Sequence, residues 1–241
     1  VISFLAPIFL GKVITNMTVN VDFEEVSYDA GEPFVQFIRE LSIECRKEGI
    51  VLSVDNYVPR ASTTHYNRKE QGIVADYVII MGYDEHFAGS ETAGSVASIG
   101  YVRNGIEKTL EEVPAEKVIN AVPFYTRLWT ETPKTEEELA AEEGTDAVEY
   151  PTKVTSEVFR MKTIMNRVKE SGATIEVDPG TNQNYAEWEE DGKIYRVWIE
   201  DATSLEMKLK LIKKYQLAGV SAWRLGWESE GIWDLILKYV N

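Results

Sequence analysis

The sequence predicts an α/β fold in which helices cover a parallel sheet. Short apolar segments alternate with amphipathic segments along most of the chain, which is typical of repeated strand–helix units. The segment Tyr77 to Met81 is apolar without interruption, as expected for a strand that is buried on both faces. Polar residues follow several of these strands, so we expect side chains with chemical roles to gather where the strands end.

Eight elements are expected in the first half of the chain. Pro33 suits the first position of a helix, and Gly49 ends the helical spacing of the apolar residues that follow it. The expected elements are a strand and turn at 1–10, a strand at 19–24, a helix at 33–49, a strand at 50–54, a short helix at 66–74, a strand at 77–84, a helix at 99–113 and a strand at 117–125.

The strand–helix alternation breaks after residue 130. Thr135 and Glu138 have the spacing of a capping box, and Asp191-Gly192 has the composition of a hairpin turn between strands at 185–188 and 194–199. The later elements are expected as a helix at 154–170, a helix at 204–215, a strand at 219–227 and a helix at 232–240. These boundaries predict barrel elements at 1–130, an α+β insertion at 131–200, and the last barrel strand with a C-terminal helix at 201–241.

Parallel strands with polar ends predict a TIM-type (β/α)8 barrel. Five or six barrel strands can be counted in the sequence, whereas a complete barrel needs about 250 residues including its helices. The 241 residues also contain the insertion, so we expect the barrel to lack part of its N-terminal half. The chain opens with Val1 instead of Met, which favours a processed product or a fragment.

Charge and the scarcity of cysteine and histidine argue against several classes of protein. With 40 acidic and 25 basic residues, the net charge of −15 argues against nucleic acid as the main partner. Cys45 is the single cysteine, so we expect a small buried hydrophobe and no internal disulfide. His65 and His86 lack the spacing of metal ligands, and we expect no metal. The longest apolar run, 1–10, is too short to span a membrane.

The segment Val19 to Glu24 places three polar side chains on one face of an expected strand. Because side chains alternate along a strand, Asn20, Asp22 and Glu24 project together, and the apolar residues between them project to the other face. Two carboxyl groups a few ångströms apart cannot both ionise cheaply, so burial of this face would keep one of them protonated. An edge strand with one face in water is the alternative interpretation.

Aromatic and polar residues recur at the ends of the later strands. This mixture suits a carbohydrate, because sugar ring faces stack on Trp and Tyr while the hydroxyl groups bind Asp, Asn and Arg. No glycine-rich loop follows a strand, which argues against a phosphate site. Taken singly, the aromatic residues could equally fill the core. The strand-end residues are Asp22 and Glu24, Asp55 and Asn56, Tyr83 and Asp84, Tyr125 and Arg127, and Trp223 and Arg224.

Four of these segments resemble strand motifs of glycoside hydrolase family 18. Asn20 and Phe23 stand where chitinases usually have Asp and Trp, which resembles the bacterial branch of spore-germination and cortex-lytic N-acetylglucosaminidases. Met17-Thr18 stands where the family usually has Asp-Gly, and the loss of that Asp is expected to lower activity. The segments, similar in order to the fourth, sixth, seventh and eighth strand motifs, are Val19-Asn20-Val21-Asp22-Phe23-Glu24, Met81-Gly82-Tyr83-Asp84, Pro123-Phe124-Tyr125-Thr126-Arg127-Leu128-Trp129 and Ala222-Trp223-Arg224-Leu225-Gly226-Trp227.

The resemblance implies a mechanism in which the substrate takes part. Glu24 would be the general acid/base that protonates the glycosidic oxygen, and the substrate's own acetamido oxygen would attack the anomeric carbon in place of a carboxylate nucleophile. Asp22 would orient the acetamido nitrogen, and Tyr83 would donate a hydrogen bond to the acetamido oxygen. No cofactor is implied. The residues expected to bind substrate are Asn20, Asp84, Tyr125 and Trp223, with Asn56, Arg127 and Asp55 as lesser candidates.

Two classes of function follow from the resemblance. One is a bacterial enzyme, secreted and associated with the cell wall or spore, that hydrolyses β-1,4 bonds next to N-acetylglucosamine with retention. Its substrate would be peptidoglycan or a chitin-type chain, cleaved in the endo or the exo mode. The other is a carbohydrate-binding protein of the same fold that has lost turnover. In both, the expected partner is a polysaccharide containing N-acetylglucosamine, with no nucleic acid and no membrane span.

Overall fold

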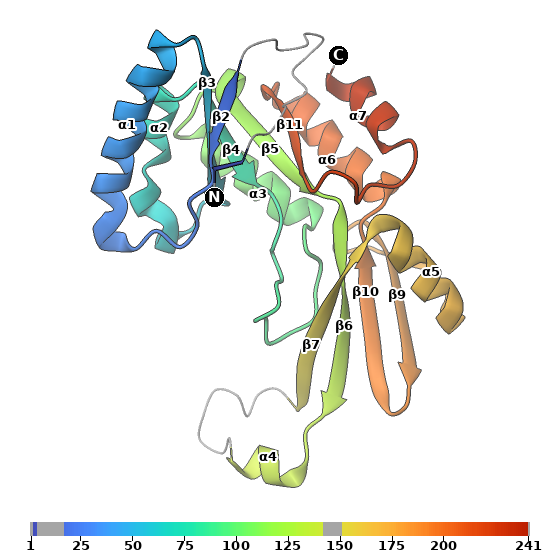
Figure 1. Ribbon diagram of the computed structural model, residues 1–241. Coiled ribbons are helices and arrows are strands. Elements are labelled where there is room, and N and C mark those ends of the chain that lie inside the picture. The colour runs from blue at the N-terminus through green and yellow to red at the C-terminus, as the bar shows by residue number, and fades with distance from the viewer. Residues whose placement is uncertain (1, 4–16, 142–150, 241) are drawn as a thin grey trace.

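The computed structural model describes residues 2–3, 17–141 and 151–240, and these residues form two sheets with helices packed around them (Figure 1). The first sheet has six strands in the order β1-β2-β3-β4-β5-β11. Most of the strand and turn predicted at 1–10 lies outside the described residues. The bounds of the six strands are β1 Ile2–Ser3, β2 Thr18–Val21, β3 Val51–Tyr57, β4 Tyr77–Met81, β5 Val118–Pro123 and β11 Gly219–Trp223.

Five strands of this sheet run parallel, as the alternation predicted. β2 pairs with β3, β3 with β4, β4 with β5, and β5 with β11, all in parallel, and β1 pairs with β2 in the antiparallel sense. The described residues therefore contain a parallel half-barrel sheet. The helices associated with it are α1 Gly31–Lys47, α2 Arg68–Val74, α3 Ile99–Leu110, α6 Ala202–Lys214 and α7 Ile232–Val240, with short 3-10 helices η1 Tyr28–Ala30, η2 Ala61–Tyr66 and η3 Ala115–Lys117.

The helices cover one face of the parallel sheet. The apolar side of α1 packs on alternate residues of β3, where Ile38 and Cys45 join Leu52 and Val54 in one buried cluster. Cys45 is 4% exposed and forms no disulfide, as predicted. A larger core fills the space between β4, β5 and the helices α3, α6 and α7. The opposite face carries a small apolar cluster of Ile79, Ile119 and Ala121, with Tyr77 and Tyr83 packed against it.

Gly82 ends β4 at a point where the chain touches β5. A Cβ atom at this position would lie 2.7 Å from Asn120 Oδ1 and 2.8 Å from the carbonyl oxygen of Ala121, which is closer than real Cβ contacts. The Gly82 amide also donates a hydrogen bond of 3.1 Å to that carbonyl. Only glycine fits this approach, and it fixes where the chain leaves the sheet immediately before Tyr83.

The second sheet is antiparallel, in the order β7-β6-β10-β9-β8, and forms the predicted insertion. The hairpin turning at Asp191-Gly192 is confirmed, with positive φ angles at both residues and Lys193 paired with Glu190. The capping box is confirmed as well, because Thr135 and Glu138 bond reciprocally at 2.9 and 3.3 Å. The elements are β6 Tyr125–Pro133, α4 Glu136–Ala141, β7 Thr152–Arg160, α5 Met161–Ser171, β8 Glu176–Asp178, β9 Gln183–Glu190 and β10 Lys193–Ile199.

The helix predicted at 154–170 is wrong in its first half. Residues 152–160 form β7, which pairs with β6 from Pro133 and Thr152 to Tyr125 and Arg160, and the helix begins only at Met161. Thr and Val side chains favour strands, and the long β6 offers a continuous hydrogen-bonding edge that outweighs the helical spacing. The strand predicted at 117–125 is divided at Phe124, so β5 belongs to the parallel sheet and β6 to the antiparallel one.

A buried ion pair joins the antiparallel sheet to α6. Glu200 follows β10 and is 0% exposed, and Lys208 on α6 is 1% exposed. The Lys208 ammonium donates to both carboxylate oxygens, at 2.9 and 2.8 Å. Ser204 and Gln183 each donate a further hydrogen bond of 2.7 Å, so the buried charge is fully solvated by protein groups. None of the described helices has the length and apolarity required to cross a membrane.

Candidate active site

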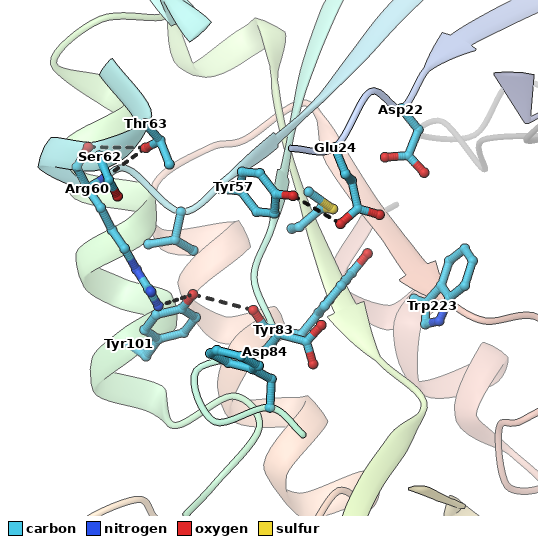
Figure 2. Close-up of a pocket in the computed structure, with 13 residues that line it drawn as sticks. Asp22, Glu24, Tyr57, Arg60, Ser62, Thr63, Tyr83, Asp84, Tyr101 and Trp223 are labelled. Carbon is cyan, nitrogen blue, oxygen red and sulfur yellow. Dashed lines mark hydrogen bonds between the residues drawn. The ribbon is translucent and has the colours of Figure 1, made fainter. Parts of the chain in front are cut away.

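A cavity of about 490 Å³ opens at the carboxyl ends of the parallel strands, where barrel enzymes place their chemistry (Figure 2). The segments after β2, β3 and β4 contribute most of its wall, and the end of β11 closes one side. The lining residues are Asp22, Glu24, Tyr57, Val58, Arg60, Ser62, Thr63, Met81, Tyr83, Asp84, Phe87, Tyr101 and Trp223.

The pairing of β2 with β3 brings acidic residues of two strands together. Val21 is paired with Val54, so the residues that follow them, Asp22 and Asp55, are neighbours on the same face of the sheet. Two residues further along, Glu24 meets Tyr57, whose hydroxyl donates a hydrogen bond of 3.2 Å to Glu24 Oε2. The predicted convergence of Asp22 and Glu24 on one side is therefore observed, and β3 adds a carboxyl group and a phenol to it.

The side chain of Asn20, on the neighbouring strand β2, holds the carboxyl group of Asp55 in place. Asn20 Nδ2 donates a hydrogen bond of 2.7 Å to Asp55 Oδ2, and Ser53 Oγ donates one of 2.6 Å to Asn20 Oδ1. The pKa of Asp55 is raised to about 7, mainly by burial, with the Asn20 hydrogen bond lowering it and the nearby charges of Asp22 and Glu24 raising it. Burial also raises the pKa of Asp22.

Tyr83 points into the cavity between the acidic residues and Trp223, as Figure 2 shows. Burial is the main cause that raises the pKa of its phenol, and the charges of Asp55, Asp22, Asp84 and Glu24 act in the same direction. The hydroxyl group therefore stays protonated and is available as a hydrogen-bond donor.

Asp84 and Tyr125 link the two sheets beside the cavity. The Tyr125 hydroxyl donates a hydrogen bond of 2.5 Å to Asp84 Oδ1, and the rings of Tyr83 and Tyr125 meet edge to face with centroids 6.1 Å apart. Asp84 lines the cavity, whereas Tyr125 is 4% exposed and contributes through Asp84. Trp223 is 48% exposed at the end of β11, so its indole is available to a ligand.

The far end of the cavity is aromatic and carries one cation. Arg60 donates a hydrogen bond of 3.2 Å to the Tyr101 hydroxyl and lies over its ring, and Tyr101 in turn donates to the carbonyl oxygen of Tyr83 at 3.4 Å. Neither Arg60 nor Tyr101 is among the residues predicted from the sequence. Tyr57 could have been found from its spacing, because Leu52 and Val54 mark the buried face of β3 and place Ser53, Asp55 and Tyr57 on the other.

Besides Tyr125, three predicted binding residues do not line the cavity. Asn56 is 0% exposed on the helix side of β3 and donates a hydrogen bond of 2.6 Å to Gln71, so it does not face the cavity. The cause is the alternation of β3, which turns Asn56 away when Asp55 faces the site. Arg127 donates to Ser156 Oγ within the antiparallel sheet, at 3.1 Å. Asn20 is 2% exposed and reaches the site only through Asp55.

Both histidine side chains form hydrogen bonds with backbone carbonyl groups. His65 Nε2 bonds the carbonyl oxygen of Val26 at 2.7 Å, and His86 Nδ1 bonds that of Ser95 at 2.8 Å. Within residues 2–3, 17–141 and 151–240, no group of three or more His, Cys, Asp or Glu side chains is arranged to hold a metal ion.

A parallel sheet whose strand ends carry carboxyl groups, phenols and an exposed indole around one cavity is typical of barrel glycosidases. Residues 17–228 match the family model Glycosyl hydrolases family 18, and the chain belongs to this family. The predicted family is thereby confirmed.

Two proteins of Bacillus subtilis are similar to this chain over most of its length. The cortical fragment-lytic enzyme of Bacillus subtilis is 28% identical over 231 residues, which cover 92% of this chain and 49% of the relative. The glycosylase YvbX of the same organism, whose role is uncharacterized, is 28% identical over 239 residues, covering 96% of this chain and 63% of YvbX. The chain thus spans about half the length of the cortical fragment-lytic enzyme.

The fold agrees with solved structures. The crystal structure of a chitinase from Chromobacterium violaceum superposes with a TM-score of 0.76 at 27% identity, over 90% of this chain and 64% of that one. The predicted barrel type is confirmed to the extent of a parallel half-barrel sheet with an antiparallel insertion.

Proposed function

We propose that this protein hydrolyses β-1,4 glycosidic bonds next to N-acetylglucosamine by a retaining mechanism in which the substrate's acetamido group is the nucleophile. The observation that carries the proposal is the convergence of Asp22, Glu24, Tyr83 and Trp223 on one cavity at the strand ends. Membership of family 18 supports it, because that family is an exception to the scheme of two catalytic carboxylates.

In the proposed first step, Glu24 donates its proton to the glycosidic oxygen as the leaving sugar departs. The acetamido oxygen attacks the anomeric carbon and forms a cyclic intermediate within the substrate. The Tyr83 hydroxyl donates to the acetamido oxygen, and Asp22 accepts from the acetamido N–H, which holds the nucleophile in place. In the second step, the Glu24 carboxylate takes a proton from water as the water oxygen attacks the anomeric carbon. The bond between that carbon and the acetamido oxygen breaks, which regenerates the acetamido group and restores the original configuration.

The half-exposed ring of Trp223 would form the floor of the subsite, because an indole face matches the apolar face of a pyranose. The similarity to a cortical fragment-lytic enzyme and to a chitinase supports a polymer of N-acetylglucosamine, either peptidoglycan of the spore cortex or cell wall or a chitin-type chain. A secreted protein associated with wall or spore agrees with this substrate.

The test is the release of reducing ends from oligomers of β-1,4-linked N-acetylglucosamine and from purified peptidoglycan. The protein should act on at least one of them, and Glu24→Gln should lower kcat at least about a thousandfold, since it removes the only proposed proton donor. Gln fits the place of Glu24, so substrate binding should persist. A wild type no faster than Glu24→Gln would contradict the proposal; saturable sugar binding without turnover would then indicate a carbohydrate-binding protein.

A further inference from the structure

Three carboxyl groups crowd one face of the parallel sheet with little to neutralise them. Asp22 and Glu24 follow β2, and Asp55 lies on β3 at the level of Asp22. Tyr57 and Tyr83 lie beside them as neutral phenols. The other titratable groups that line the same cavity are Asp84, Tyr101 and Arg60. The Asp55 side chain takes part in none of the ion pairs formed among the described residues. Its carboxyl group accepts a hydrogen bond from the amide of Asn20.

The two oxygens of Asp55 have different surroundings. Oδ2 accepts the hydrogen bond from Asn20 at 2.7 Å, whereas Oδ1 is buried and has no hydrogen-bond partner within the part of the chain that the structure describes. A buried carboxylate oxygen without a donor is costly, but a protonated one can itself donate. Asp22 is the acidic neighbour at the same level of the sheet, one strand away.

We propose that Asp55 is a positioning residue that stays protonated in the resting enzyme and donates a hydrogen bond to the Asp22 carboxylate, which keeps Asp22 oriented toward the substrate's acetamido group. The proposal rests on the proposed function, since it assigns Asp22 its task. Asp55 does not line the cavity and so acts through Asp22. The raised pKa of Asp55 agrees with this protonation state.

The arrangement also gives a role to Asn20. Its amide donates to one Asp55 oxygen and leaves the other for Asp22, and Ser53 fixes the orientation of the amide from the opposite side. Asn and Asp side chains have the same shape and differ only in that Asn has an NH2 group in place of one carboxyl oxygen. The neighbouring strands β2 and β3 thus carry one amide, Asn20, and one carboxyl group, Asp55. Two carboxyl groups there would repel each other, and two amides would leave no acid to titrate.

The kinetic test compares substitutions of Asp55 across pH. Asp55→Leu removes the donor while keeping the number and branching of the side-chain heavy atoms, and it should lower kcat about thirtyfold or more with a much smaller change in KM. Asp55→Asn keeps a donor that cannot ionise, so it should cost only about threefold near pH 6. It should also remove the fall in kcat/KM that we expect of the wild type above about pH 7. The same substitution at exposed Asp29, outside the cavity, is the matched control and should leave the pH profile unchanged.

An exchange of the two residues gives a second test. Asn20→Asp alone places a carboxyl group against Asp55 and should lower kcat/KM about tenfold or more near pH 8. The double variant Asn20→Asp with Asp55→Asn restores one acid and one amide and should recover most of that loss. A double variant no better than Asn20→Asp, an Asp55→Leu variant with wild-type kcat, or an unchanged pH profile in Asp55→Asn would each overturn the proposal.

A measurement without substrate separates this proposal from the proposed function. The carboxyl ¹³C resonances of Asp-labelled protein, assigned by comparison with Asp55→Asn, should show Asp55 titrating near neutral pH. Titration of Asp55 in the ordinary aspartate range would overturn the inference even in an active enzyme. Absence of turnover in a protein whose Asp55 titrates near neutrality would instead count against the proposed function. Circular dichroism of each variant confirms that the fold is retained.

Discussion

Glu200, which follows β10 of the antiparallel sheet, and Asp55, on β3 of the parallel sheet, are acidic residues with buried carboxyl oxygens. The two carboxyl groups differ in the hydrogen-bond donors and the charges around them. Glu200 receives donors from Lys208, Ser204 and Gln183, including a full positive charge. Asp55 receives a single amide donor and faces two further acids. Burial raises the pKa of both, but only at Glu200 does a cation oppose the rise.

This difference in hydrogen-bond donors distinguishes a structural role for Glu200 from a chemical role proposed for Asp55. A buried carboxylate with a complete set of donors ties the antiparallel sheet to α6 and has nothing left to offer a ligand. A carboxyl group left short of donors beside a cavity keeps its proton near neutral pH and can act in catalysis. The parallel sheet therefore gives up some stability at the strand ends, while the insertion does not.

Removal of Lys208 should have the largest effect on stability. Lys208→Met leaves Glu200 buried without a cation, and the free energy of unfolding should fall by about 3 to 5 kcal/mol, measured by urea denaturation. Lys210→Met on the same helix is the control, because its pair with Glu206 is exposed and worth less than about 0.5 kcal/mol. Adding Glu200→Gln to Lys208→Met should recover part of the loss. A change no larger than that of the control would mean that the buried ion pair contributes little.

Removal of the Tyr83 hydroxyl should affect turnover without affecting the fold. Tyr83→Phe deletes the donor proposed for the acetamido oxygen, and kcat/KM should fall about thirtyfold to a hundredfold, or about 2 to 3 kcal/mol of transition-state stabilisation. Steady-state kinetics on N-acetylglucosamine oligomers measures it. Tyr101→Phe removes a hydroxyl from the far end of the same cavity and should cost less than Tyr83→Phe; the reverse order would place the chemistry elsewhere.

Asp55→Asn should stabilise the protein at alkaline pH. The folded-state pKa of about 7 exceeds the ordinary value of 3.8, so the folded state binds a proton more tightly and stability is lost as the pH rises from about 4 to 7. The variant should therefore be more stable than the wild type by about 1 to 2 kcal/mol near pH 8, with the gain shrinking toward pH 4. Denaturant midpoints at the two pH values test this, and a gain independent of pH would contradict the assignment.

Trp223→Ala should give the smallest of these effects. Its ring is 48% exposed, so truncation should leave the free energy of unfolding almost unchanged while KM for the sugar oligomer rises about fivefold to tenfold. Leu225→Ala, at a side chain that is 77% exposed and outside the cavity, is the control. Equal KM values for the two variants would remove Trp223 from the binding site.

Much of the parallel sheet could be predicted because the hydrophobic pattern within each segment indicates whether it is a strand or a helix. The run Tyr77 to Met81 and the spacing in α1 each reflect burial by neighbours that any similar sequence would require. The insertion was less predictable. Residues 152–160 carry both helical and strand spacing, and their fate depends on β6, which lies about 20 residues earlier in the chain.

The candidate site was predictable where one segment carries it and not where strands must be aligned. Asp22 and Glu24 share a face in the sequence itself, and Tyr83 and Trp223 end their strands. Choosing between Asp55 and Asn56 requires knowing which face of β3 meets the helices, and that follows from Leu52 and Val54 only once the helix is placed. The contributions of Arg60 and Tyr101 depend on loop paths that no periodicity encodes.

The long segment between Asp84 and Ser98 is attached mainly to the insertion. The Trp129 indole donates a hydrogen bond of 2.8 Å to the carbonyl oxygen of Gly94, Ser95 bonds Gln183, and Tyr125 holds Asp84. Phe87, within this segment, is part of the cavity wall. Substitutions in the antiparallel sheet can therefore reshape the cavity wall at Phe87 while the strand ends that carry Asp22 and Glu24 stay as they are. Under the proposed function, substrate selection and bond cleavage can thus evolve separately.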